Sequence, residues 1–105
     1  MTAWNIEALT GYRPITTFWE DFSIADCFGE DAVRATYRRA MDEWKSDYRY
    51  LTELVMVLNW KIWEHFDHGS DKLAAVYNGL WSAADKYACE NLTGDELSYF
   101  YEMTD

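Results

Sequence analysis

The chain has 105 residues, half of them apolar, and it includes six Trp, eight Tyr and five Phe. This length and composition predict one folded domain with a hydrophobic core and exclude a disordered chain. Nineteen acidic residues against nine basic ones give a formal net charge of −10, which disfavours direct binding to nucleic-acid phosphates and favours a basic protein partner.

Two further features of the sequence indicate a cytoplasmic protein that does not contact a membrane. The longest apolar run, Leu54 to Leu58, is far shorter than the roughly twenty residues that a membrane-spanning helix needs, and no export signal precedes it. Cys27 and Cys89 occur singly, without a CxxC motif. We therefore expect two buried free thiols rather than a disulfide.

The spacing of apolar residues predicts helices joined by short turns, because the one Pro and nearly all of the five Gly fall between amphipathic stretches. Residues Met1 to Ile15 lack a regular period and are predicted to form an irregular N-terminal arm, held by Trp4, Ile6 and Leu9. Residues 16–105 are predicted to form a single helical domain.

The first predicted helix begins at Thr17, which forms an S/T-x-x-E capping box with Glu20, and ends near Phe28 before Gly29. Its expected inner residues are Phe18, Phe22, Ala25 and either Trp19 or Ile24. The second predicted helix covers residues 30–46, with apolar residues at helical spacing. These residues are Val33, Tyr37, Ala40, Met41 and Trp44.

The third predicted helix is the central one. It starts at a cap on Ser46 or Asp47, reaches about Phe66 and is followed by Gly69. Its wide apolar stripe consists of Leu51, Leu54, Val55, Leu58, Ile62 and Phe66.

A fourth helix is predicted from the cap at Ser70 to Asn91, and a short last helix opens with a second capping box, Thr93 and Glu96. Their expected inner residues are Leu73, Val76, Tyr77, Leu80, Ala84 and Tyr87, then Leu97, Phe100 and Tyr101. The short connections imply antiparallel neighbours, so the prediction is an all-α, compact four- to five-helix bundle.

The stretches TTFWEDFSIADCFG and YLTELVMVLNWKIWEHF resemble those of a family of small uncharacterised proteins carried by conjugative and phage-like mobile elements of Gram-positive bacteria. The resemblance covers most of the chain after Tyr12. It includes no catalytic motif, so it implies an accessory protein of a mobile element rather than an activity.

His65 and His68 are three residues apart, close enough on a helix to share a metal ion, with Glu64 or Asp71 as an oxygen ligand. A zinc site needs more spaced ligands, and the sequence has no HExxH motif. The alternative places His65 at the edge of the apolar stripe and His68 at the negative end of a helix dipole. We expect this alternative, and therefore no metal and no cofactor.

Other catalytic patterns are weak. Adjacent acids on a helix point about 100° apart and do not converge on a substrate, and the sequence contains no GxSxG, P-loop or dinucleotide-binding motif. Arg34, Arg38 and Arg39 each lie four residues from an acid, so intrahelical ion pairs are expected instead of a phosphate-binding stripe. We predict a protein without enzymatic activity and without catalytic residues.

The far side of the central helix carries the candidate site. Met56, Trp60 and Trp63 form a second apolar line opposite the main stripe, which packs either against the same chain or against a partner. The predicted partner-binding residues are Met56, Trp60, Trp63, Glu53, Glu64 and Asp67.

These observations predict a small acidic protein-interaction module. It would act as an accessory or regulatory protein of a mobile element and present a DNA-like acidic surface to a basic partner. Two alternatives remain open: a structural homodimer without a ligand, and a metal-dependent enzyme that uses His65 and His68.

Overall fold

The computed structural model describes residues 5–105. This part of the chain forms six helices and no strand, so the prediction of an all-α fold is confirmed. The helices are α1 (Ile6–Thr10), α2 (Phe18–Asp26), α3 (Glu30–Trp44), α4 (Tyr48–Asp67), α5 (Asp71–Asn91) and α6 (Gly94–Thr104).

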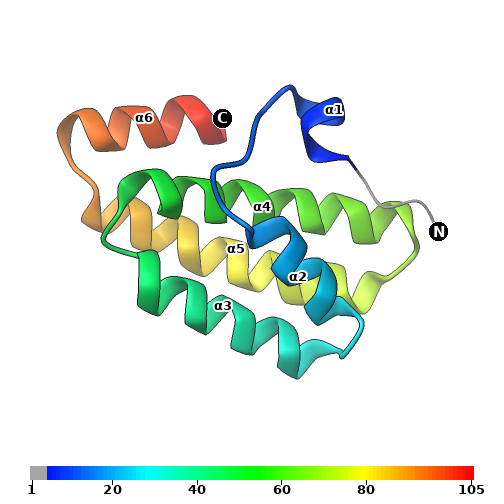
Figure 1. Ribbon diagram of the computed structural model, residues 1–105. Helices are drawn as coiled ribbons and strands as arrows, with labels where there is room; N and C mark the ends of the chain where they lie inside the picture. Colours follow the sequence, from blue (N-terminus) through cyan, green and yellow to red (C-terminus); the bar gives the residue numbers. More distant parts are fainter. Residues whose placement is uncertain (1–4) are drawn as a thin grey trace.

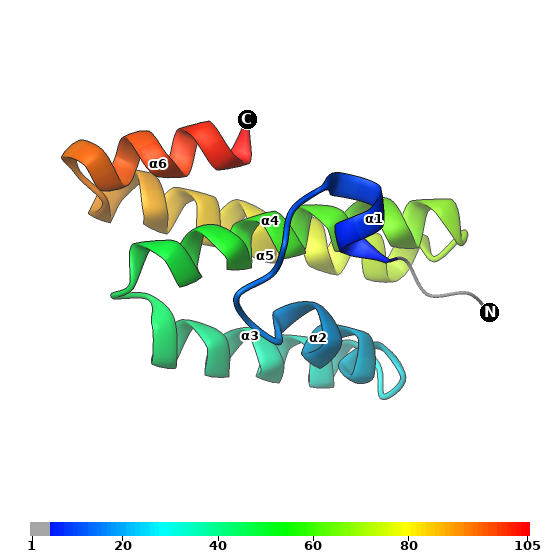
Figure 2. The ribbon, with the colours of Figure 1, turned by 45° about the horizontal axis from the view of Figure 1, so that its top comes forward.

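The helices are arranged around a central antiparallel pair. Helices α4 and α5 make the most extensive contact in the molecule, with α2 and α3 on one side and α6 and α1 on the other (Figure 1). The view from a second direction shows the same order of layers (Figure 2). Because α4 is covered on both sides, all eight residues from Leu51 to Leu58 are buried.

The main stripe of α4 forms the core as predicted, except at its end. Leu51, Leu58 and Ile62 are buried, whereas Phe66 is 53% exposed, which corrects its assignment to the core. With 3.6 residues per turn, Phe66 points about 80° away from Leu58, while the residue two turns after Leu58 is His65. His65 therefore takes the inward position and is buried.

The N-terminal arm is not wholly irregular, because it contains the short helix α1. Asn5 caps this helix by accepting a hydrogen bond from the Ala8 N–H at 3.1 Å, and Gly11 ends it with a φ of 75°. Ile6 holds the arm to the core, whereas Leu9 is exposed. The predicted contribution of Trp4 lies outside the described residues.

The capping boxes correctly marked two helix starts, but their hydrogen bonds differ from the prediction. Neither Thr17 nor Thr93 makes a side-chain cap; the Thr17 hydroxyl instead bonds to the Asp21 carboxylate at 3.0 Å. The predicted helix over residues 30–46 ends at Trp44, two residues early. These differences are local and leave the bundle unchanged.

Candidate functional site

Glu53 is the first of the predicted partner-binding residues, and it is buried rather than exposed. Its carboxylate accepts hydrogen bonds from the Tyr12 hydroxyl at 2.6 Å, the Ile15 N–H at 2.8 Å and the Thr16 N–H at 2.9 Å. The Thr16 hydroxyl is a further donor. These four donors satisfy the hydrogen-bonding capacity of the buried carboxylate. Glu53 thus attaches the α1–α2 connection to α4, which corrects its placement beside a partner surface.

Glu64 is also buried, in an ionic cluster that the sequence reasoning missed. At its centre the Lys61 side chain is 1% exposed and donates a hydrogen bond to Ser23 Oγ at 2.7 Å. It also binds Asp26 Oδ2 at 3.0 Å and Glu64 Oε1 at 2.9 Å. The ammonium lies 4.2 Å from the centroid of the Trp19 ring, a cation–π distance. All three N–H donors of Lys61 are therefore used.

The second half of this cluster surrounds the Asp26 carboxylate at the end of α2. His65 Nε2 lies 2.9 Å from Asp26 Oδ2, and the Tyr77 hydroxyl donates to Asp26 Oδ1 at 2.5 Å. The His65 ring stacks on Tyr77, with centroids 5.3 Å apart. We call Ser23, Asp26, Lys61, Glu64, His65 and Tyr77 the Lys61 cluster. It joins α2, α4 and α5, and the Tyr77 hydroxyl also lies 3.4 Å from the Phe22 carbonyl oxygen of α2.

The bonds of the Lys61 cluster shift two pKa values in opposite directions. Burial raises the pKa of Asp26, but the hydrogen bonds from His65 and Tyr77, together with the charge of Lys61, outweigh burial and hold that pKa below its usual value. Burial and the Asp26 carboxylate raise the pKa of Tyr77 far above its usual range. At neutral pH, Asp26 is therefore a carboxylate and Tyr77 a neutral donor.

The Lys61 cluster also contains the ligand types of a metal centre. Asp26, Glu64 and His65 each offer an atom within 4.8 Å of the others. However, the Lys61 ammonium already binds both carboxylates, and a divalent ion placed there would be repelled by that charge. His68, the predicted second imidazole ligand, is exposed at the C-cap of α4. Lys61 thus supplies, between Asp26 and Glu64, the positive charge that a metal ion would otherwise supply.

The predicted aromatic line on α4 is split into a covered half and an exposed half. Met56 is buried and Trp60 is half-buried, with the Tyr12 ring 5.9 Å from the Trp60 ring between centroids. Trp63 is 56% exposed. The connection between α1 and α2 therefore covers the first half, so Met56 cannot serve as a surface contact.

The exposed half consists of Trp63, Phe66 and Asp67, and we call these three residues the outer α4 face. The Trp63 and Phe66 rings contact each other with centroids 5.9 Å apart, and Asp67 is exposed. Positions three and four residues apart lie on the same side of a helix, so these side chains form one patch. Of the six predicted partner-binding residues, Trp63 and Asp67 are the two that are exposed.

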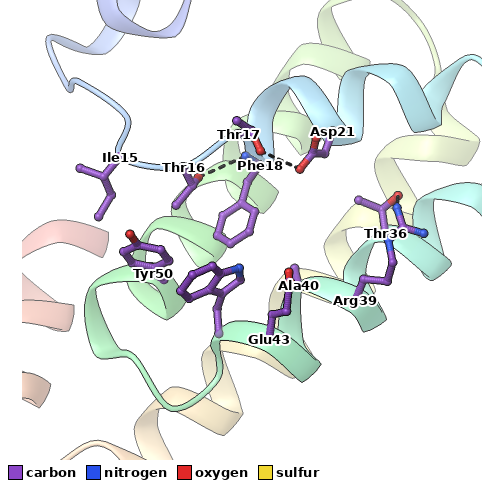
Figure 3. A pocket seen from close by; sticks show the side chains of 11 residues that line it. Ile15, Thr16, Thr17, Phe18, Asp21, Thr36, Arg39, Ala40, Glu43 and Tyr50 are labelled. Atoms are coloured by element: carbon purple, nitrogen blue, oxygen red, sulfur yellow. Dashed lines mark hydrogen bonds between the residues drawn. The ribbon is translucent and has the colours of Figure 1, made fainter.

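A pocket of about 350 Å³ lies elsewhere, between the start of α2, α3 and the start of α4. Figure 3 shows Arg39 and Glu43 on one wall and Asp21 on the other. The Trp44 and Tyr50 rings, 4.2 Å apart between centroids, also line it. The two carboxylates of Asp21 and Glu43 against the one guanidinium of Arg39 give this pocket only a small negative charge.

The ion pairs predicted along α3 form only in part. Arg34 pairs with Glu30 at 2.9 Å, whereas Arg39 donates to the Thr36 hydroxyl at 3.3 Å. Cys27 and Cys89 are free, as predicted, but exposed rather than buried.

No family model, no curated protein and no solved structure matches this chain. Within residues 5–105, every helix is too short or too polar to cross a membrane.

Proposed function

We propose that this chain is a protein-interaction module without enzymatic activity, which binds a basic partner protein through the outer α4 face. The observation that carries this proposal is the contact between the exposed Trp63 and Phe66 rings beside Asp67. A few residues carry most of the binding energy in protein interfaces, and tryptophan is enriched among them. In the genetic setting implied by the sequence resemblance, the module would serve a mobile element as an accessory or regulatory protein.

The charge of the chain supports a basic partner. A net charge of −10 exceeds the magnitude of about 2 to 8 that is ample for the solubility of a small domain. Such a field mainly accelerates the encounter with a positive surface, while apolar contacts slow dissociation. Asp67 places one of these charges directly beside the two rings.

The Lys61 cluster supports a structural role for Lys61, Glu64 and His65 of α4. Its buried charges are bonded to one another across three helices, an arrangement that fixes packing. The proximity of Asp26, Glu64 and His65 keeps a metal-dependent enzyme as the second candidate. A self-associating homodimer remains the third, and it would use the same exposed rings.

The test begins with the partner, isolated by co-purification from the organism that encodes the chain and then purified. Hydroxyl-radical labelling, read by mass spectrometry, measures how far each aromatic side chain is covered in the complex. We expect labelling of Trp63 and Phe66 to fall, while labelling of Phe28, which is 78% exposed in the connection between α2 and α3, stays unchanged. Protection of Phe28 with unchanged labelling of Trp63 would contradict the proposal.

Sedimentation velocity of the isolated chain separates the homodimer from the proposed module. The module predicts a monomer whose sedimentation coefficient does not depend on concentration. A dimer in which Trp63 and Phe66 are protected from labelling would instead support the homodimer.

A further inference from the structure

A groove of about 420 Å³ lies between the N-terminal segment, α4, Trp81 of α5 and the end of α6. In both views the end of α6 lies close to the segment that joins α1 to α2, above α4 (Figures 1 and 2). We call this the Trp60 groove, and the residues that matter for its chemistry are Tyr12, Trp60, Trp81, Glu102, Met103 and Asp105. Its volume falls within the range of small-ligand sites.

We propose that the Trp60 groove binds an arginine side chain of the partner protein. The proposal rests on the proposed function, because it names the chemistry by which the same partner would be recognised. Three aromatic side chains, Tyr12, Trp60 and Trp81, line the groove. A guanidinium is planar, stacks on indole rings and forms forked hydrogen bonds with carboxylates, so its chemistry matches this lining.

The charge of the groove is negative and is not balanced within it. Glu102 and Asp105 line one end, and none of the described lining residues is Lys, Arg or His. Burial raises the pKa of Asp85 in α5, and the charge of Asp105 raises it further. A cation in the groove would therefore be attracted by several carboxylates.

The Lys61 cluster shows how this protein holds a cation of its own. There an ammonium lies 4.2 Å from the centroid of the Trp19 ring and binds the carboxylates of Asp26 and Glu64. The Trp60 groove combines the same two elements, indole rings and carboxylates, but is open to solvent and carries no cation from the chain. A partner is then the natural source of the positive group.

Continuity along α4 joins the groove to the proposed binding surface. Trp60 lines the groove and precedes the exposed Trp63 by three residues, so both lie on one side of the helix. A partner that covers Trp63 can extend a long side chain along the same side of α4 toward the groove. The arginine would thus set the orientation of the complex, while the exposed rings hold it.

The test uses the purified chain and two short blocked peptides, acetyl-Gly-Arg-Gly-amide and the same peptide with citrulline. Citrulline keeps the shape of arginine and removes its charge. We expect the arginine peptide to shift a subset of the Trp indole N–H signals in NMR titrations, with binding at least about tenfold tighter than that of the citrulline peptide. Equal binding of the two peptides, or no shift with millimolar arginine peptide, would overturn the proposal.

Two matched double variants of α6 locate the site. Glu102→Gln with Asp105→Asn removes the side-chain carboxylates of the groove, and Asp95→Asn with Glu96→Gln removes two exposed acids from the other end of the same helix. We expect the first pair to weaken arginine-peptide binding at least about tenfold and the second to leave it unchanged. An equal loss in both would show that net charge, and not the groove, attracts the peptide.

Circular dichroism verifies that both double variants keep the helical fold, which is expected because all four residues are exposed. The peptide titration uses no partner protein, so it tests the groove separately from the proposed function. If the arginine peptide fails to bind but the partner still covers Trp63 and Phe66, the groove proposal fails alone. If the peptide binds as expected and the partner leaves Trp63 uncovered, the proposed function fails alone.

Discussion

Replacement of Lys61 by Met is the most informative test of the buried ionic cluster. Met fills a similar volume without a charge, so the change leaves the Asp26 and Glu64 carboxylates without their shared cation. Asp26 keeps its bonds to His65 and Tyr77. Glu64 loses the one cation that lies within 4 Å of it among the described residues.

The expected loss follows from the burial of these groups. Removal of one partner from a buried ion pair costs about 3 to 5 kcal/mol, because the remaining charge is uncompensated. The Asp26 and Glu64 side chains are 14% and 10% exposed, so water relieves part of this cost. We therefore expect the free energy of unfolding to fall by about 3 kcal/mol.

Urea unfolding followed by circular dichroism measures this free energy. Lys72→Met on the exposed surface of α5 is the control and should change stability by less than about 0.5 kcal/mol. The double variant with Lys61→Met and Glu64→Gln should recover part of the loss, because the second change removes one uncompensated charge. A loss below about 1 kcal/mol in Lys61→Met would refute the reasoning, since that is the size of a solvent-exposed pair.

Four further predictions concern stability, local order and metal binding. The pKa of Asp26 is lower in the folded state, so Asp26 stabilises the fold above the ordinary carboxyl pKa of about 3.9, and this stabilisation is lost as the pH falls through the folded value. Asp26→Asn should therefore weaken the fall in the free energy of unfolding at acid pH, measured by urea unfolding at several pH values. An unchanged pH dependence would contradict the assignment. Leu58→Ala should cost about 2 to 5 kcal/mol in the same assay, because Leu58 is fully buried, and retained stability would place it outside the core. Glu53→Gln should speed amide exchange at Ile15 and Thr16, whose N–H groups bond to its carboxylate, and unchanged protection would refute its anchoring role. Zinc should bind weakly in isothermal titration calorimetry, because the Lys61 ammonium already lies between the Asp26 and Glu64 carboxylates. A tight zinc complex that is lost in His65→Ala would instead support the metal-dependent enzyme.

The helices could be predicted because their sequence signals are periodic and local. The stripe of Leu51, Leu58 and Ile62 repeats at helical spacing and is buried as expected. Helix ends depend on few hydrogen bonds and varied by one or two residues, as at Trp44. The short helix α1 was missed because five residues show too little periodicity.

The candidate site could be predicted only in part, because long-range polar contacts leave almost no pattern in a sequence. Glu53 looked like a surface acid, and its partners Tyr12 and Thr16 are separated from it by more than thirty residues. Lys61 offered one usable signal: it follows Leu54 by seven residues, two helical turns, and so falls near the inner side of α4. A lysine there indicates a buried anionic partner.

The central claim is that the outer α4 face holds a basic partner protein. Its most direct test is the dissociation rate of the purified partner from the double variant Trp63→Ser, Phe66→Ser, compared with Ile24→Ser, Phe28→Ser. The second variant removes two apolar side chains that are at least as exposed, Ile24 of α2 and Phe28 of the connection between α2 and α3. The account predicts dissociation at least about thirtyfold faster in the first variant, the effect of losing about 2 kcal/mol at an interface hot spot, and an unchanged rate in the second. An unchanged rate in the first variant, or equal acceleration in both, would contradict it.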